Sequence, residues 1–364
     1  MSNRNAFERN CNNFDLIRLI AAYMVIWAHS YAISPKDGKT ELLIRLTGIT
    51  HAGEIAVFIF FFFSGAFIFK SMESSKTEFD FLVKRFFRIV PALVVCVLLV
   101  VAMGMLFTTL SISDYLKDHQ VHKYITHNIK LVWNEHFLPG VFENHPNKGV
   151  NGSLWSITLE ARLYLTIFIV GLLGVFRERY AASVVIVLLL VWVFISPASV
   201  PLIGSDKQLM GLEVFPQYTV TFLLGGLVYF NSTYFKVDTA AIIVLGIVLA
   251  LSRNTMLFKS AIMVFSIGLA YYIGTSKLAM KIHLPADFSY GIYLYGWPAG
   301  QLAYELFPNA GPEGNTLMAF VVATILAVGS WYLIEKPSLN LARRITGRTR
   351  LSKENVVELR ASSN

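Results

Sequence analysis

The sequence predicts an all-α, polytopic membrane protein with about ten transmembrane helices and both termini in the cytoplasm. Composition is the first reason: 55% of the 364 residues are hydrophobic and 15% are charged, whereas soluble domains carry about 25% charged residues. Apolar stretches of near-spanning length recur along the whole chain, and Lys and Arg gather in alternate loops. A mean hydropathy of +0.56 also indicates an integral membrane protein. These observations exclude an ordinary soluble enzyme, a coiled coil and a disordered protein.

A helix needs about 20 mostly apolar residues to cross a bilayer. Ten segments approach this length, although the seventh and eighth are short, and one re-entrant pair is the alternative for those two. The ten segments are residues 14–33, 55–69, 89–110, 154–176, 181–195, 214–230, 240–251, 261–273, 288–306 and 317–334.

The distribution of positive charge sets the topology. With the N-terminus inside, the cytoplasmic loops hold roughly twice as many Lys and Arg residues as the outer loops, as the positive-inside rule requires. We therefore expect a transmembrane domain over residues 1–340, an outside loop over about 111–152 and a basic cytoplasmic tail over 341–364. The polar N-terminus lacks a cleavable signal-peptide pattern, so the first span is expected to be permanent. Topology also explains the net charge of +8, and we expect no nucleic-acid partner.

The outside loop begins with a segment at Ser111 that is typical of a capped amphipathic helix. Cys11 and Cys96 are too few for a disulfide framework. Five histidines occur in the loop, but their spacing lacks a tight ligand pair with a carboxylate on one helix face, so we expect a solvated loop or lid and no metal site. The five are His119, His122, His127, His136 and His145.

Ionisable side chains inside spans are costly and need a partner or a function. Arg18 and His29 lie 11 residues apart in the first segment, so they share one helix face about 16 Å apart along the axis. Asp15 precedes Arg18 by three residues and can pair with it. Two structural alternatives stay open: the arginine snorkels to headgroups, or the histidine only bonds a neighbouring helix.

A second group of charges lies at the cytoplasmic end of the third segment. Arg85 and Arg88 are three residues apart and share a face. Two guanidinium forks on one face suit phosphate groups. The alternative is a topology anchor, since cations collect on the inner side in any case.

A third group follows the outside loop, where Glu160 and Arg162 lie inside an apolar run. They are two residues apart and face different ways, so each needs a partner on another helix. We expect His29 to be the partner of Glu160, since both lie in the outer half of the membrane or near its middle. An interhelical hydrogen bond with a purely structural role is the alternative.

Together these stretches resemble the acyltransferase-3 family of integral membrane acyltransferases, over about residues 14–337. Each stretch alone is a weak signal, but six in the same order are a strong one. One departure is Gly296, where many members have a histidine. The stretches are Asp15-x2-Arg18-x10-His29, Phe62-Phe-Ser-Gly65, Arg85-x2-Arg88-Ile-x-Pro91, Ser153-Leu-Trp-Ser-x3-Glu160, Ser289-Tyr-Gly-Ile-Tyr-Leu294 and Leu333-Ile-Glu-Lys-Pro337.

The resemblance implies a multi-pass protein of the cell inner membrane, surrounded by lipid, that moves an acetyl group from acetyl-CoA to a glycan hydroxyl. Acetyl-CoA is expected as a donor substrate rather than as a bound cofactor. The acceptor class comprises exopolysaccharides, O-antigens and lipo-chitooligosaccharide nodulation factors. A succinyl or other acyl group is the alternative to acetyl.

A mechanism follows as a hypothesis. The donor phosphates meet Arg18, Arg85 and Arg88 at the inner mouth, and His29 acts as general base on the acceptor hydroxyl. Glu160 orients the imidazole and stabilises its protonated form, with a transient acyl-histidine as a variant. The positions expected to support these groups are Asp15, Ser64, Ser153 and Trp155.

A proton-coupled transporter is the main rival, because buried Arg, His and Glu also suit a carrier. Against it, the sequence shows no inverted repeat and no paired Gly or Pro breaks between its halves. A sensor or scaffold without catalysis is a third hypothesis, and it leaves the shared face of Arg18 and His29 unexplained.

Overall fold

The structure is a computed structural model that describes residues 6–8, 11–131, 133–196 and 215–347. These residues are helices joined by loops, with one isolated antiparallel bridge between Thr108 and Val141. The predicted all-α class is confirmed. Of the predicted basic tail, residues 348–364 lie outside the described residues.

Each of the ten predicted segments overlaps a helix. Segment 89–110 runs three residues past the end of its helix, segment 154–176 ends in a 3₁₀ turn, Val175–Arg177, and residue 214 lies outside the described residues. The helices are α1 Phe14–Ile33, α2 Leu42–Thr47, α3 Ala52–Glu73, α4 Glu78–Phe107, α5 Ile112–Lys117, α6 His119–Lys130, α7 Leu154–Gly171, α8 Arg179–Ile195, α9 Phe215–Phe230, α10 Thr239–Leu251, α11 Phe258–Gly274, α12 Lys277–Met280, α13 Ser289–Leu306, α14 Gly311–Ser330 and α15 Lys336–Ile345.

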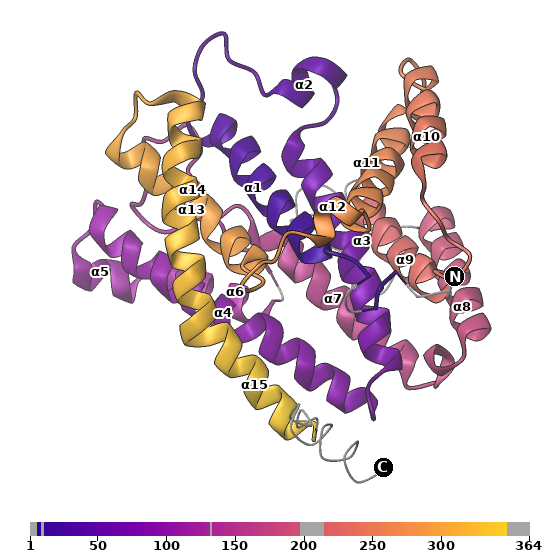
Figure 1. Ribbon diagram of the computed structural model, residues 1–364. Helices are drawn as coiled ribbons and strands as arrows, with labels where there is room; N and C mark the ends of the chain where they lie inside the picture. The colour runs from indigo at the N-terminus through magenta and orange to yellow at the C-terminus, as the bar shows by residue number, and fades with distance from the viewer. Residues whose placement is uncertain (1–5, 9–10, 132, 197–214, 348–364) are drawn as a thin grey trace.

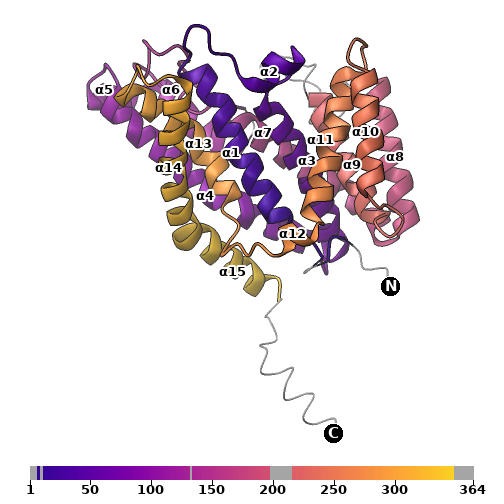
Figure 2. The ribbon, with the colours of Figure 1, turned by 45° about the horizontal axis from the view of Figure 1, so that its top comes forward.

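Five helical stretches in the described part are long and apolar enough to cross a membrane: α1, α3, α4, α7 and the continuous run from α14 to α15. The apolar helices α8, α10 and α11 are shorter. The number of crossings and the side of each terminus therefore stay predictions. The start of α1 and the end of α15 lie at the same end of the bundle, as Figure 2 shows.

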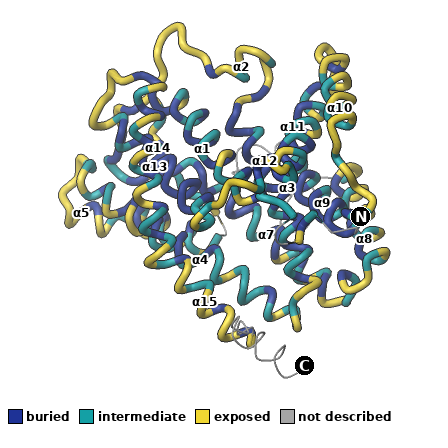
Figure 3. Tube along the Cα trace, in the orientation of Figure 1, coloured by how far each residue is buried: buried dark blue, intermediate teal, exposed yellow. Residues whose placement is uncertain are grey.

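The centre of the bundle is formed by α1, α3 and α13. Helix α3 packs against both α1 and α9, and α13 packs against both α1 and α14 (Figure 1). Helices α3 and α13 are buried over most of their length, whereas α10 at the edge has no buried residue (Figure 3). The site described below lies among the central helices.

Glycine allows α3 and α9 to approach closely. A Cβ atom added at Gly65 would lie 1.9 Å from the carbonyl oxygen of Phe222, and one added at Gly225 would lie 2.0 Å from the carbonyl oxygen of Phe62. Small residues that let two backbones touch are typical of helix packing in membranes. This contact fixes the depth of α3, and with it the depth of the neighbouring Ser64.

Local signals in the sequence position both ends of the site. The side-chain oxygen of Asn13 caps α1 by accepting from the N–H of Leu16, while its amide nitrogen donates to the carbonyls of Ala279 and Ile282. At the far end of the chain, α14 continues through a π-helical turn, Trp331–Glu335, into α15. Such turns are rare and often occur at functional sites.

The outside loop matches its prediction only in part. The Ser111 hydroxyl accepts from the N–H of Asp114 at 3.1 Å, which confirms the predicted helix cap. The last part of the loop is not solvated, because His145, Val150 and Asn151 are all buried. This part packs on α13 instead.

Candidate active site

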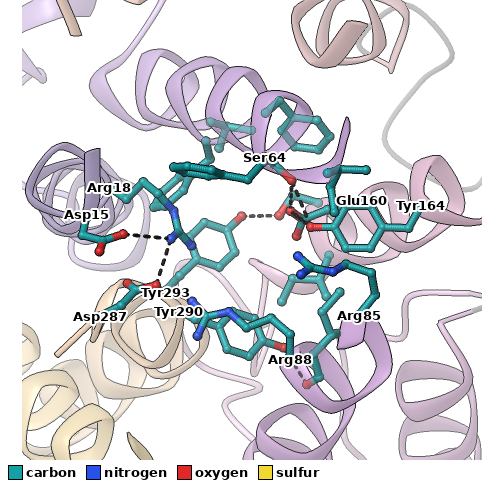
Figure 4. A pocket seen from close by; sticks show the side chains of 18 of the residues that line it. Asp15, Arg18, Ser64, Arg85, Arg88, Glu160, Tyr164, Asp287, Tyr290 and Tyr293 are labelled. Carbon is teal, nitrogen blue, oxygen red and sulfur yellow. Dashed lines mark hydrogen bonds and ion pairs between the residues drawn. The ribbon is translucent and has the colours of Figure 1, made fainter. Parts of the chain in front are cut away.

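A cavity of about 330 Å³ opens among α1, α3, α4, α7 and α13. It lies towards the end of the bundle where α1 begins, and Leu339 of α15 adds to its wall. Six of the residues predicted for the site line it, and Figure 4 shows them converging from different helices. The six are Asp15, Arg18, Ser64, Arg85, Arg88 and Glu160.

Two of the arginines share one carboxylate. Arg18 Nη1 lies 2.8 Å from Asp287 Oδ2, and Arg88 Nη2 contacts the same oxygen. The predicted pair of Arg18 with Asp15 is confirmed at 3.7 Å, and Arg88 also faces Glu335 at 3.7 Å. The guanidinium groups of Arg18 and Arg88 are thus neutralised from within the protein.

Asp287 links three helices. Its other oxygen, Oδ1, accepts from the N–H of Ser289 at 3.2 Å and from its hydroxyl at 2.5 Å, at the start of α13. Burial opposes ionisation of Asp287, but Arg18 and Arg88 outweigh burial and hold its pKa well below the usual range. The carboxylate therefore ties α1 and α4 to the start of α13.

Arg85 differs from the other two arginines. Its Nη2 donates to the Ser71 hydroxyl at 3.3 Å, and its buried Nε has no hydrogen-bond partner. Arg85 forms no ion pair with any residue in the part of the chain that the structure describes. Figure 4 shows its guanidinium group pointing into the cavity, across from Glu160.

Glu160 forms a cluster of oxygen atoms with two hydroxyl groups. Its Oε1 accepts from the hydroxyls of Ser64 and Tyr164, the latter at 2.5 Å. A second hydroxyl pair, Ser156 with Tyr293, lies on the same cavity wall. The cavity thus offers several hydroxyl groups and, among the described residues, one arginine without a carboxylate partner.

His29 does not line this cavity. Its ring is half-buried and lies edge-on to Trp297, with 4.6 Å between the ring centroids. Its Nδ1 is buried and has no hydrogen-bond partner among the described residues. His51, before the start of α3, lies close enough to interact with it electrostatically.

The structure does not bring Glu160 to His29, which corrects the expected pair. A Cβ at Gly53 would lie 3.2 Å from Cβ of Ala28, so this part of α3 is level with His29. Ser64, which binds Glu160, follows 11 residues later on α3, about 16 Å further along the axis. Glu160 is therefore close to the depth of Arg18, not that of His29.

The remaining predicted positions are structural neighbours of the cavity. The carbonyl of Ser153 accepts from the hydroxyl of Tyr293 at 3.2 Å, and the Ser153 hydroxyl is buried without a partner in the described part of the chain. Trp155 packs on Tyr218 with 5.2 Å between ring centroids. Neither Ser153 nor Trp155 lines the cavity.

The sequence analysis missed several residues of the site. Asp287 precedes the Ser289-Tyr-Gly segment by two residues, which is the one signal that could have drawn attention to it. Tyr164 lies four residues after Glu160, one turn away on the same helix face.

No group of His, Cys, Asp and Glu that could hold a metal occurs in the described ranges.

The family assignment rests on a comparison with known proteins. The family model described as "Acyltransferase domain" (Acyl_transf_3) matches residues 12–336, which is nearly the whole described chain. The chain belongs to the acyltransferase-3 family.

Two curated relatives of this acyltransferase agree with the assignment. An O-acetyl transferase of Shigella phage Sf6 is 29% identical over 338 residues, covering 90% of this chain and 96% of the relative. Nodulation protein 10 of Rhizobium leguminosarum bv. viciae is 26% identical over 369 residues, covering 93% and 95%. No solved structure matches.

Proposed function

We propose that this acyltransferase moves an acetyl group from acetyl-CoA to a hydroxyl of a cell-surface or secreted glycan, in the inner membrane. Two features together carry the proposal: a cavity near the start of α1 that Arg85 lines, and His29 further along α1, whose buried Nδ1 has no hydrogen-bond partner among the described residues. The two curated relatives support the reaction by their names alone.

The arginine cavity suits the phosphates of the donor. Arg85 has spare donors inside it, while Arg18 and Arg88 are held side by side by Asp287. Charged forks bind phosphate oxygens more strongly than neutral donors do. The distance of about 16 Å from Arg18 to the level of His29 suits a pantetheine arm that carries the thioester.

His29 is the proposed general base. The acceptor hydroxyl loses its proton to the imidazole as its oxygen attacks the thioester carbonyl, and the C–S bond breaks. The proton then passes to the thiolate of coenzyme A. Glu160 cannot orient His29 from its observed depth, so we assign it to the donor cavity, where it holds Ser64 and Tyr164 opposite Arg85.

The proton-coupled transporter is the alternative. The buried Arg, His and Glu residues would suit a carrier. The inverted repeat that is typical of such transporters is not visible in the sequence. Purified protein that transfers labelled acetyl to a glycan without solute flux across vesicles would favour the acyltransferase. Solute flux without transfer would favour the carrier.

The decisive variant is His29→Ala. We expect loss of glycan acetylation at unchanged membrane levels, because the base that accepts the hydroxyl proton is gone. His122→Ala is the matched control, since His122 is exposed on α6 far along the chain from the site. Normal acetylation by His29→Ala, measured by mass spectrometry of surface glycans, would refute the mechanism.

A further inference from the structure

A buried hydrogen-bond network connects the outside loop to α13, beside His29. Gln301 is fully buried, and its amide nitrogen donates to two loop carbonyls, Asn147 at 2.7 Å and Gly149 at 2.6 Å. The indole N–H of Trp297 donates to the same Gly149 carbonyl at 2.7 Å. One loop carbonyl therefore receives donors from two residues of α13, one turn apart.

The orientation of the Gln301 amide is fixed by these bonds. Since its nitrogen serves both carbonyls, its oxygen faces His145, which lies 2.8 Å away through Nδ1. The other ring nitrogen of His145 lies 2.6 Å from Glu305. Because the amide oxygen can only accept, Nδ1 of His145 is the donor in this bond, and the ring connects Glu305 to Gln301.

The loop also closes directly on the indole ring. A Cβ atom added at Gly152 would lie 2.7–2.8 Å from three ring atoms of Trp297. Trp297 itself is 8% exposed and lies against the ring of His29. The indole ring is thus held from two sides of the loop: by its own bond to the Gly149 carbonyl, which Gln301 also binds, and by contact with Gly152.

We propose that Gln301 is a positioning residue: through the loop and Trp297 it fixes the outer wall against which the His29 ring lies. The expected effect of Gln301 on catalysis rests on the function proposed above. Its expected effect on the accessibility of His29 does not. Gln301 touches no reacting atom and acts only through Trp297. The loop at residues 145–152 becomes part of the active-site wall rather than a lid.

Gln301→Leu replaces the amide, with its donors and its acceptor, by an apolar side chain of similar size. Gly152→Ala pushes on Trp297 from the loop side and leaves every bond of Gln301 intact. Asn315→Leu is the matched control: Asn315 is a buried amide that donates to the Gly300 carbonyl at 2.8 Å. It lies against the same helix but does not reach the loop or Trp297.

The test is the rate at which diethyl pyrocarbonate modifies His29 in the purified full-length protein, measured by peptide mass spectrometry, with exposed His122 as internal reference. We expect at least fivefold faster modification in both Gln301→Leu and Gly152→Ala, and a change below twofold in Asn315→Leu. Unchanged modification of His29 in the first two variants, or an equal rise in the control, would overturn the proposal.

Catalysis supplies a second measurement. We expect kcat for acetyl transfer to fall at least tenfold in Gln301→Leu with an unchanged KM for acetyl-CoA, because the donor cavity is not disturbed. His145→Gln keeps an amide donor for Gln301 and should retain more activity than His145→Leu. Equal losses in these two variants would argue for a merely structural role.

The two failures are distinguishable. Should the purified wild-type protein transfer no acetyl group, the proposed function fails, while the modification rates still decide the role of Gln301. Should His29→Ala keep full activity, only the proposed general base fails. Should His29→Ala be inactive and the modification rates stay unchanged in Gln301→Leu, only the positioning role fails. Size-exclusion chromatography and thermal unfolding of each variant show that the comparison is made on folded protein.

Discussion

Asp287 offers the most direct test of how the site is held together. Replacing it with Asn keeps the shape of the side chain but removes the charge that Arg18 and Arg88 share. Two guanidinium groups would then lie side by side without their common partner. We expect Asp287→Asn to lower the free energy of unfolding and to separate α1 and α4 from the start of α13.

The magnitude follows from burial. The side chains of Asp287, Arg88 and Arg18 are 14%, 17% and 19% exposed, so solvent screens the pairs only weakly. Removing one partner of a buried ion pair costs about 3–5 kcal/mol. Arg88 retains Glu335 and Arg18 retains Asp15, each at 3.7 Å. These residual pairs place the expected loss at the lower end, about 3 kcal/mol.

The ionisation of Asp287 itself adds no pH dependence near neutrality. The folded-state pKa of Asp287 is depressed, so its contribution is fully present above the unfolded-state value of about 3.9 and is lost only as the pH falls through the folded value. The part of the difference between wild type and Asp287→Asn that comes from the charge of Asp287 should therefore be constant from about pH 5 to pH 8.

The assay is reversible unfolding of purified protein in mixed micelles at two pH values in this range. Glu313→Gln is the control, since Glu313 pairs with Lys39 at 2.5 Å on the exposed surface and should contribute nothing measurable. A loss in Asp287→Asn no larger than in the control would refute the reasoning. A loss that grows steeply between pH 5 and pH 8 would also contradict it.

Three further predictions test packing, donor binding and helix capping. Gly65→Ala should lose about 3 kcal/mol of stability in the same assay, because the added methyl group would collide with the backbone of Phe222. Gly329→Ala is the control and should be neutral, because its methyl group would meet nothing within 4 Å. Arg85→Ala should raise the KM for acetyl-CoA at least tenfold in steady-state kinetics, since one charged hydrogen bond contributes about 1.5–3 kcal/mol; an unchanged KM would remove Arg85 from the donor site. Asn13→Ala should lose about 1–2 kcal/mol, because it removes a helix cap and two bonds to the segment at α12; full stability would show that the cap is dispensable.

Much of the fold could be predicted because it depends on local properties of the chain. Long apolar runs specify the helices, and the cap at Ser111 and the pair of Asp15 with Arg18 need only neighbours three residues apart. Spacing along one helix is therefore a reliable guide to which residues share a face.

The partners of the charged residues could not be predicted, because they depend on how far one helix slides past another. The sequence shows that Glu160 needs a partner, but the close contact of Gly65 with α9 sets the depth of α3 and brings Ser64 to Glu160. Asp287 lies in a loop, where no periodicity marks the direction of a side chain. His145 shows the same limit, since contacts with residues far along the chain, Gln301 and Tyr304, remove it from solvent.

The charge balance of the cavity limits how the donor can be recognised. Three arginines line it, but so do three carboxyl groups, those of Asp15, Glu160 and Asp287, and the formal charges cancel. A net attraction for any anion is thus not what the lining provides. We therefore expect directed hydrogen bonds to supply the proposed recognition of the donor. Among the three arginines, only Arg85 lacks a carboxylate partner in the described part of the chain. Under the proposed function, Asp287 keeps Arg18 and Arg88 in place without repulsion, and a donor phosphate binds beside them with Arg85 as the cation that it neutralises.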